Sequence, residues 1–151
     1  MSVVEDRLAE LGIELPAPRP AAGNYRGYVW AGDLLFTAGQ GADGHIGTVG
    51  HDVTIEQAQE AARASALNVL AQVKAALGSL DRVEKVVKLV GYVRATPDFD
   101  QHPKVLDGAS NVIVDIFGPE VGPHARTAVG AGSLPKNFSV EVELIVQVAG
   151  D

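Results

Sequence analysis

The sequence contains no cysteine among its 151 residues. Disulfide bonds, thiolate zinc sites and cysteine nucleophiles are therefore excluded, and this composition is typical of a reducing compartment. The sequence also lacks the run of about 18 apolar residues that a membrane-spanning helix needs. Its first 11 residues carry three acidic side chains and no apolar core, which is not the pattern of a signal peptide. We expect a cytoplasmic protein with no membrane partner.

Positive charge is scarce as well. The chain has 12 lysines and arginines against 19 aspartates and glutamates, and its formal net charge is -7. These cations are scattered, so they do not form the dense basic stripe that nucleic-acid binding usually requires. Hydrophobic residues make up 46% of the chain and charged residues 21%, which are ordinary values for one folded domain. We expect a single domain over residues 1–151 and no nucleic-acid partner.

Common catalytic motifs are missing from the sequence. It has no G-x-S-x-G, S-x-x-K or H-E-x-x-H pattern. The glycine-rich segment 39–44 has neither the G-x-G-x-x-G order nor the lysine of a phosphate-binding loop. The histidines lie singly in predicted loops, without the spacing that places two metal ligands on one helix face: His45, His51, His102 and His124. We expect surface histidines and no metal site.

Helical spacing of apolar residues predicts helices over residues 2–11, 54–77 and 103–117. The first two begin at Ser2 and Thr54, each followed three residues later by the Glu or Gln of a capping box. Gly108 lies inside the third helix, which indicates a close approach of another backbone. Three prolines between residues 16 and 20 prevent regular structure there. Residues 1–22 are therefore predicted to be an N-terminal helix followed by an extended proline-rich segment.

Five segments are predicted to be strands: 28–31, 34–40, 83–95, 126–131 and 138–148. Gly32 and Asp33 separate the first two and suit a tight type II′ hairpin turn. In the last segment apolar residues alternate with polar ones, and Glu141 and Glu143 fall on the polar side. The order of elements predicts an α+β fold in which two helices cover one face of a mixed sheet. Apolar residues on the other face would need a second chain to cover them, so we expect a homo-oligomer.

Arg126 stands out near the C-terminal end of the sequence. It begins a predicted strand just after a Gly-Pro turn, in His124–Val129. Such a placement suits recognition of a planar carboxylate, because two parallel N–H bonds of the guanidinium fix both position and orientation. The same residue types also allow a plain surface ion pair between Arg126 and Glu141 or Glu143. The residues alone leave these two interpretations open.

At this point the sequence resembles a known family. The similar stretches are 35–40 (LFTAGQ), 66–68 (ALN), 90–93 (VGYV), 124–129 (HARTAV), 134–135 (LP) and 140–143 (VEVE). They resemble the RidA/YjgF family of reactive-intermediate deaminases, and the resemblance runs from about Leu11 to the end. It implies a chorismate-mutase-like α+β fold of the bacillar type. It also implies a homotrimer with active sites in the clefts between subunits.

The resemblance implies an activity and assigns roles to residues. The family hydrolyses small enamines and imines of the 2-aminoacrylate type to 2-keto acids and ammonia, with no metal or organic cofactor. Arg126 matches the arginine that grips the substrate carboxylate, and Glu141 matches the glutamate associated with the attacking water. Tyr25 matches the tyrosine that closes the cleft. Gly39 and Ala128 match backbone positions that line it.

Two positions depart from the family pattern. Ala38 stands where typical deaminases have a serine, and Pro103 stands where they have an asparagine, so the chain resembles a divergent subgroup. Both changes remove hydrogen-bonding groups from the expected pocket wall. They motivate a second hypothesis, a trimeric protein that binds small carboxylates without converting them. A third, the endoribonuclease activity often attached to the family name, is disfavoured by the net charge of -7.

Overall fold

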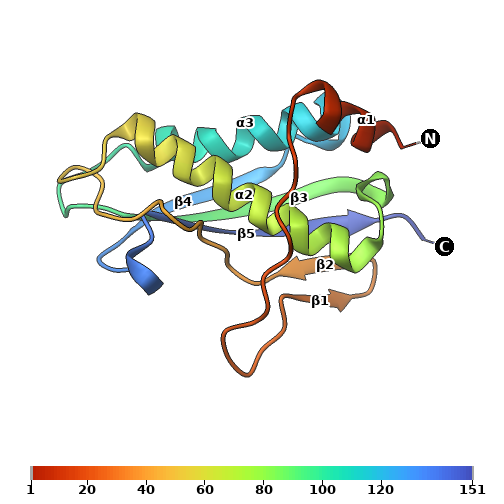
Figure 1. Cartoon of the computed structure of the whole chain (residues 1–151), viewed down its shortest axis with the longest axis horizontal. Coiled ribbons are helices and arrows are strands. Elements are labelled where there is room, and N and C mark those ends of the chain that lie inside the picture. The colour runs from red at the N-terminus through yellow and green to blue at the C-terminus, as the bar shows by residue number, and fades with distance from the viewer. Residues whose placement is uncertain (1, 151) are drawn as a thin grey trace.

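In the computed structural model, which describes residues 2–150, a five-stranded mixed β-sheet carries helices on one face (Figure 1). The helices are α1 (Val3–Glu10), α2 (Ile55–Leu77) and α3 (His102–Val121), with short 3-10 turns η1 (Leu80–Arg82) and η2 (Pro135–Asn137). The strands are β1 (Tyr28–Ala31), β2 (Leu34–Thr37), β3 (Val83–Arg94), β4 (Ala125–Ala131) and β5 (Val140–Val148). The predicted α+β class is therefore confirmed.

The strands lie in the order β1-β2-β5-β3-β4. The strand that comes fifth in the sequence thus occupies the centre of the sheet, antiparallel to both β2 and β3. Strands β3 and β4 pair in parallel, and α3 connects them across the covered face. Gly32 and Asp33 form the two-residue turn of the predicted hairpin, since Ala31 pairs with Leu34. The topology brings residues that are far apart in the sequence into neighbouring strands.

Local capping signals define the helix starts as predicted. In α2 the Gln57 amide donates to Thr54 Oγ1 at 3.1 Å, and the Thr54 amide donates to Gln57 Oε1 at 2.9 Å. In α1 the Glu5 amide donates to Ser2 Oγ at 3.0 Å. The predicted close approach at Gly108 is confirmed, because a Cβ there would overlap the Gln59 carbonyl oxygen of α2. Glycine therefore allows α3 to pack directly on α2.

Several boundaries differ from the prediction. The third helix begins one residue earlier, at His102, and the backbone of Gly118 (φ 87°) breaks it before a final turn that ends at Val121. Strand β2 ends at Thr37 instead of residue 40, and β5 begins at residue 140 instead of 138. The pairing with β5 is interrupted after Phe36, which pairs with Ile145, and resumes at Gln40, which pairs with Val142, with the register shifted by one residue. The loop that follows β2 forms one wall of the candidate site.

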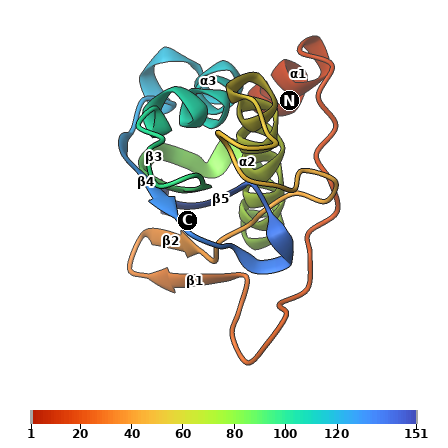
Figure 2. The same cartoon turned by 90° about the vertical axis from the view of Figure 1, so that its left-hand side faces the viewer.

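The hydrophobic core lies between the sheet and helices α2 and α3, which Figure 2 shows on the same side of the strands. The alternation predicted for β5 is confirmed, because every second residue from Val140 to Val148 is buried and the residues between them are half-buried. The opposite face of the sheet carries exposed apolar side chains, including Val29, Phe36 and Val129. Coverage of that face by further copies of the chain remains a prediction.

The N-terminal extension is an ordered part of this fold. After α1 the chain runs along the outer side of α2 before it enters β1 (Figures 1 and 2). Arg7 Nη1 donates to the Ile116 carbonyl of α3 at 3.1 Å, and the Val4 amide donates to Asp81 Oδ1 at 2.8 Å. Within residues 2–150, no helix has both the length and the apolar character needed to cross a bilayer.

Candidate functional site

Three of the predicted site residues lie around one pocket. Tyr25, Gly39 and Glu141 all line a cavity of about 140 Å³. They come from three separate segments: the extension before β1, the loop after β2, and the central strand β5. The fold therefore brings together residues separated by more than a hundred positions in the sequence.

Hydrogen bonds hold the loop after β2 in place beside β5. The Gln40 amide donates to the Val142 carbonyl at 2.9 Å, and the Val142 amide donates to the Gln40 carbonyl at 3.0 Å. Asn68, buried on α2, donates from Nδ2 to the Gly41 carbonyl at 2.8 Å. These bonds fix the loop from both sides.

The Glu141 carboxylate is half-buried at the edge of this pocket. Burial raises the pKa of Glu141 above its ordinary value, and repulsion from the Glu143 carboxylate raises it further. A Cβ on Gly39 would lie 3.2 Å from Glu141 Oε2, so a glycine at this position leaves the carboxylate accessible. A partly desolvated carboxylate that a ligand can reach is suited to proton transfer.

Glu143 is engaged differently from Glu141. Tyr92 Oη donates to Glu143 Oε1 at 2.9 Å, and this bond is the main reason that the pKa of Tyr92 is raised. Among residues 2–150, the Glu141 side chain has no such hydrogen-bond partner. The two carboxylates share one face of β5, as predicted, but only Glu141 lines the pocket.

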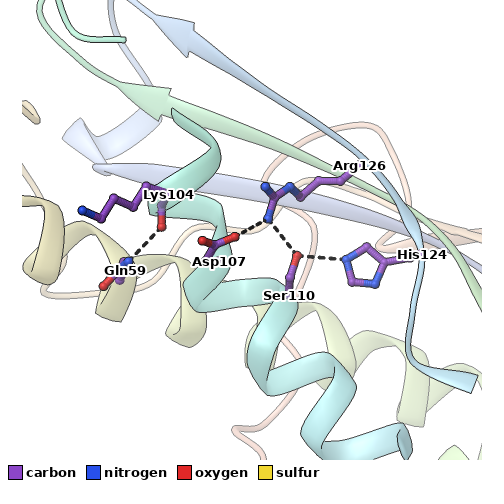
Figure 3. A network of polar contacts seen from close by, with 6 residues as sticks. All are labelled: Gln59, Lys104, Asp107, Ser110, His124 and Arg126. Atoms are coloured by element: carbon purple, nitrogen blue, oxygen red, sulfur yellow. Dashed lines mark hydrogen bonds and ion pairs between the residues drawn. The ribbon is translucent and has the colours of Figure 1, made fainter. Parts of the chain in front are cut away.

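Arg126 lies in a second region, between β4 and α3 (Figure 3). Its Nη1 donates to Asp107 Oδ1 at 2.9 Å and to Ser110 Oγ at 3.1 Å. The expected surface partner, Glu141 or Glu143, is wrong: the ion pair is formed with Asp107. Among the described residues, Nε and Nη2 of Arg126 have no hydrogen-bond partner, and the side chain is 23% exposed. One edge of the guanidinium is therefore free to bind a ligand.

The strand register explains why Arg126 and Glu141 lie apart. Arg126 pairs with Leu89, whose side chain is buried beneath the helices, whereas Glu141 pairs with Tyr92. Residues 89 and 92 of β3 point to opposite faces of the sheet, because side chains alternate along a strand. Arg126 thus lies on the helix-covered face and Glu141 on the open face. A single chain does not bring the two together.

His124 extends the contacts of Arg126 by one further step (Figure 3). Its Nδ1 lies 2.7 Å from the Gly122 carbonyl, and its Nε2 lies 3.0 Å from Ser110 Oγ. A carbonyl only accepts, so Nδ1 carries the proton, and in the neutral ring Nε2 accepts from the Ser110 hydroxyl. Ser110 Oγ in turn accepts from Arg126. With a neutral imidazole, these contacts form a chain of hydrogen bonds that runs from Arg126 through Ser110 and His124 to the Gly122 carbonyl.

The sequence prediction missed Asp107 and Ser110. They lie three residues apart on α3, so they share a helix face, and that spacing is the only signal the sequence offers. Pro103, which was expected in the pocket wall, lies in the first turn of α3, and the polar groups beside Arg126 come from later in that helix. Ala128 lies on β4 two residues after Arg126, on the same face.

Within residues 2–150, no group of three or more His, Asp or Glu side chains is arranged to hold a metal ion.

Comparison with known proteins was made with this geometry in hand. Residues 5–148 match the family described as "YjgF/chorismate_mutase-like, putative endoribonuclease". The chain is 44% identical over 150 residues to Protein TCP17 of Trypanosoma cruzi, and the alignment covers 96% of this chain and 94% of that protein. The crystal structure of Atu1372 from Agrobacterium tumefaciens is 44% identical, with a TM-score of 0.89 over 97% of this chain and 94% of that one. A crystal structure from Shewanella oneidensis, named as a putative endoribonuclease, is 36% identical and has a TM-score of 0.91, and the match covers 96% of this chain and 99% of that one.

Proposed function

The chain belongs to the YjgF/chorismate-mutase-like family, and from this premise we propose that it hydrolyses small 2-imino acids, or their enamine forms, to 2-keto acids and ammonia. The observation that carries the proposal is the state of Glu141. Its carboxylate is half-buried, has a raised pKa, and lines a small pocket together with Tyr25 and Gly39. A base of this kind is suited to activating a water molecule next to an electrophilic carbon.

The reaction needs little from the protein. The carbon of an imine is already electrophilic, so water adds to it directly once both are held in position. Glu141 accepts a proton from the water as the new C–O bond forms and passes it to the imine nitrogen, which gives a carbinolamine. Glu141 then accepts the proton of the new hydroxyl and delivers it to the amino nitrogen as the C–N bond breaks, so that ammonia leaves and the carbonyl of the keto acid remains. One water is consumed for each imine, and no electrons are exchanged with another reactant.

Arg126 supplies the anchor for the substrate carboxylate in this proposal. Its Nε and Nη2 edge is available, while Asp107 and Ser110 hold Nη1. Because Arg126 and Glu141 lie on opposite faces of the sheet, the arginine that serves a given Glu141 belongs to a neighbouring copy of the chain. This requirement supports a homotrimer with shared sites, and the exposed apolar side chains Val29, Phe36 and Val129 offer a surface for such contacts.

The direct test is to generate 2-aminoacrylate or 2-iminopropanoate in situ and to follow the release of keto acid and ammonia. We expect the protein to raise both rates above the spontaneous hydrolysis rate, and Glu141→Gln to remove most of the increase. Release at the spontaneous rate with the parent protein would contradict the proposal.

The second candidate function is binding without turnover. Ala38 favours it, because this residue lies next to Gly39 at the pocket and its methyl group provides no hydroxyl to assist proton transfer. Calorimetric binding of keto acids with no acceleration of imine hydrolysis would support this alternative. The endoribonuclease activity in the family description gains no support from a net charge of -7.

A further inference from the structure

The Glu141 pocket also contains two cations that the reaction above does not use, Arg19 and Lys136. We propose that these cations bind a second carboxylate, so that the preferred substrates are imines of dicarboxylic acids. This inference deepens the proposed function, and the part of it that concerns imines rests on that function. The binding site itself is argued from the contacts of the two side chains.

Arg19 is held in place from three directions. Its Nη2 forms an ion pair with Asp43 Oδ1 at 2.9 Å, and its Cζ lies 5.7 Å from the centre of the Phe138 ring. Its backbone carbonyl accepts a hydrogen bond from Gln72 Nε2 of α2 at 2.8 Å. The side chain is only 26% exposed. An arginine fixed in this way binds an anion with little further loss of side-chain freedom.

Lys136 reaches the pocket from an unusual turn. Both Lys136 (φ 55°) and Asn137 (φ 60°) adopt the left-handed region, which residues with a side chain rarely occupy. The Gly47 amide donates to the Asn137 carbonyl at 3.0 Å, and the Phe138 amide donates to the Pro135 carbonyl at 3.1 Å. Strained residues of this kind persist where the surroundings hold them, and they are concentrated at functional sites. Here the turn keeps a cation and an aromatic ring at the pocket.

The balance of charge in the pocket favours an anionic ligand. Glu141 is the one acidic residue among those lining the pocket, against the two cations, and Asp43 is 82% exposed outside it. Arg19 already has Asp43 as a partner, but a substrate with an apolar side chain would cover Lys136 without offering it one, which is unfavourable for a charged group. A substrate with a second carboxylate would give Lys136 a partner and Arg19 a second one through charge-assisted hydrogen bonds. The cavity of about 140 Å³ restricts the ligand to a small molecule.

The product keto acids test the site without any need for turnover. We compare 2-oxoglutarate with 2-oxopentanoate, which has the same five-carbon chain but a terminal methyl group in place of the second carboxylate. Titration calorimetry on the parent protein should show binding of 2-oxoglutarate that is about 10- to 100-fold tighter, the range expected for a hydrogen bond between charged groups. Equal affinities would overturn the inference.

Variants of the two cations test which side chain binds the second carboxylate. Arg19→Gln and Lys136→Gln should each reduce the preference for 2-oxoglutarate and leave the affinity for 2-oxopentanoate unchanged. Arg63→Gln is the matched control, because it removes one positive charge from an exposed position on α2, and it should behave like the parent. If Arg19→Gln weakens both ligands equally, Arg19 holds the carboxylate common to both, and the second-carboxylate site is wrong.

The two proposals can fail separately. A protein that prefers 2-oxoglutarate but does not hydrolyse imines would retain the dicarboxylate site and lose the proposed reaction. A protein that hydrolyses 2-iminopropanoate as fast as 2-iminoglutarate, with equal affinity for the two keto acids, would retain the reaction and lose the second-carboxylate site.

Discussion

The regions around Arg126 and Glu141 are built in different ways. The Arg126 region consists of regular elements, β4 and α3, and the guanidinium is fixed by Asp107 and Ser110. The Glu141 region joins a central strand to a loop, a strained turn and the N-terminal extension, and the Glu141 carboxylate is bound by none of the described residues. A fixed, fully charged group is suited to holding a ligand. A desolvated and unpartnered group is suited to reacting with one.

This contrast has a direct consequence for the assembly. In the proposed reaction each chain supplies an anchor, Arg126, and a reactive pocket around Glu141, and the structure places these on opposite faces of the sheet. On that proposal a single chain holds two half-sites. The division of labour between the halves can be tested by changing one of them at a time.

Glu141→Gln should have the largest effect on turnover. We expect kcat for imine hydrolysis to fall by about 10²- to 10⁴-fold, the range typical for loss of a general base. The affinity for keto acids should stay close to that of the parent, because the amide keeps the shape of the carboxylate. Steady-state kinetics and calorimetry on the same protein check both parts.

Glu143→Gln is the control for that prediction. It makes the same chemical change on the same face of β5, but at a side chain that accepts a hydrogen bond from Tyr92 and does not line the pocket. An equal loss of kcat in both variants would mean that the reactive role is not particular to Glu141.

Arg126→Lys and Arg126→Ala should have the opposite profile, with a loss of binding. Lysine keeps the charge but not the two parallel donors, so both variants should weaken keto-acid binding by about 10- to 100-fold. Calorimetry with pyruvate or 2-oxobutyrate measures this. Unchanged affinity in Arg126→Ala would reject Arg126 as the carboxylate anchor, and the Asp107 ion pair would then be only a partly exposed surface contact.

Mixing the two kinds of variant tests whether the halves meet between chains. Hybrid trimers of Glu141→Gln and Arg126→Ala subunits contain one interface with both an intact Glu141 and an intact Arg126. After unfolding and random reassembly, the mixture should recover roughly a quarter of the parent activity, since three trimers in four are hybrids with one intact site in three. The unmixed variants carried through the same procedure should recover none. If mixing gives no increase in activity, Arg126 and Glu141 do not form a shared site between chains.

Ser110→Ala and His124→Gln should have smaller effects. Ser110→Ala removes the bond that Arg126 donates to Ser110 and the bond between Ser110 and His124, whereas His124→Gln removes the two bonds of the imidazole ring. Asp107 still holds Nη1 of Arg126 in both variants, so we expect keto-acid binding to weaken by about 2- to 10-fold. The value of kcat should change little, because neither residue lies at the Glu141 pocket. Rates at saturating substrate give kcat and rates at low substrate give kcat/KM, so the two measurements separate an effect on the chemical step from an effect on binding. A loss confined to kcat would show that the network acts on the chemical step and not on the anchor.

The smallest predicted effect concerns stability. The pKa of Glu141 is raised in the folded state, so its protonated form favours folding and this contribution is lost as pH rises through that pKa. Glu141→Gln should therefore melt a few degrees above the parent at neutral pH, with the effect limited by solvent screening of a half-buried group. The difference should vanish at a pH below the ordinary glutamate range. If the melting temperatures of Glu141→Gln and the parent differ by the same amount at every pH, the difference comes from side-chain packing and not from the raised pKa of Glu141.

The features that sequence predicted well have strong local signals. The capping box at Thr54 and the alternation along β5 are decided by neighbouring residues, and the structure confirms them. The errors lie where contacts between distant segments decide. The second strand ends early where its register with β5 shifts by one residue, and its partners there, Ile145 and Val142, lie more than a hundred positions away.

The same division applies to the candidate site. Of the residues to which the resemblance assigns roles, Tyr25, Gly39 and Glu141 line one pocket, whereas Arg126 and Ala128 lie on the other face of the sheet. The partner of Arg126 was predicted wrongly, because Asp107 reaches it only through the crossing of α3 over β4. The parallel register of β3 and β4 sets that crossing, and no local pattern in the sequence encodes it. The cations Arg19 and Lys136 became visible as a pair only in the folded pocket.

The central position of β5 also bears on how the protein is made. Four strands leave the ribosome before β5, and until it arrives the β1–β2 hairpin has no strand to connect it with the β3–β4 pair. During that interval the nascent chain presents two open strand edges to its neighbours, which is the condition that favours mispairing between chains. The arrival of β5 fills both edges, and the same strand carries Glu141 into its pocket. Chains interrupted before β5 should therefore be targets for chaperones and proteases, and the Glu141 pocket should form at the moment when that vulnerability ends.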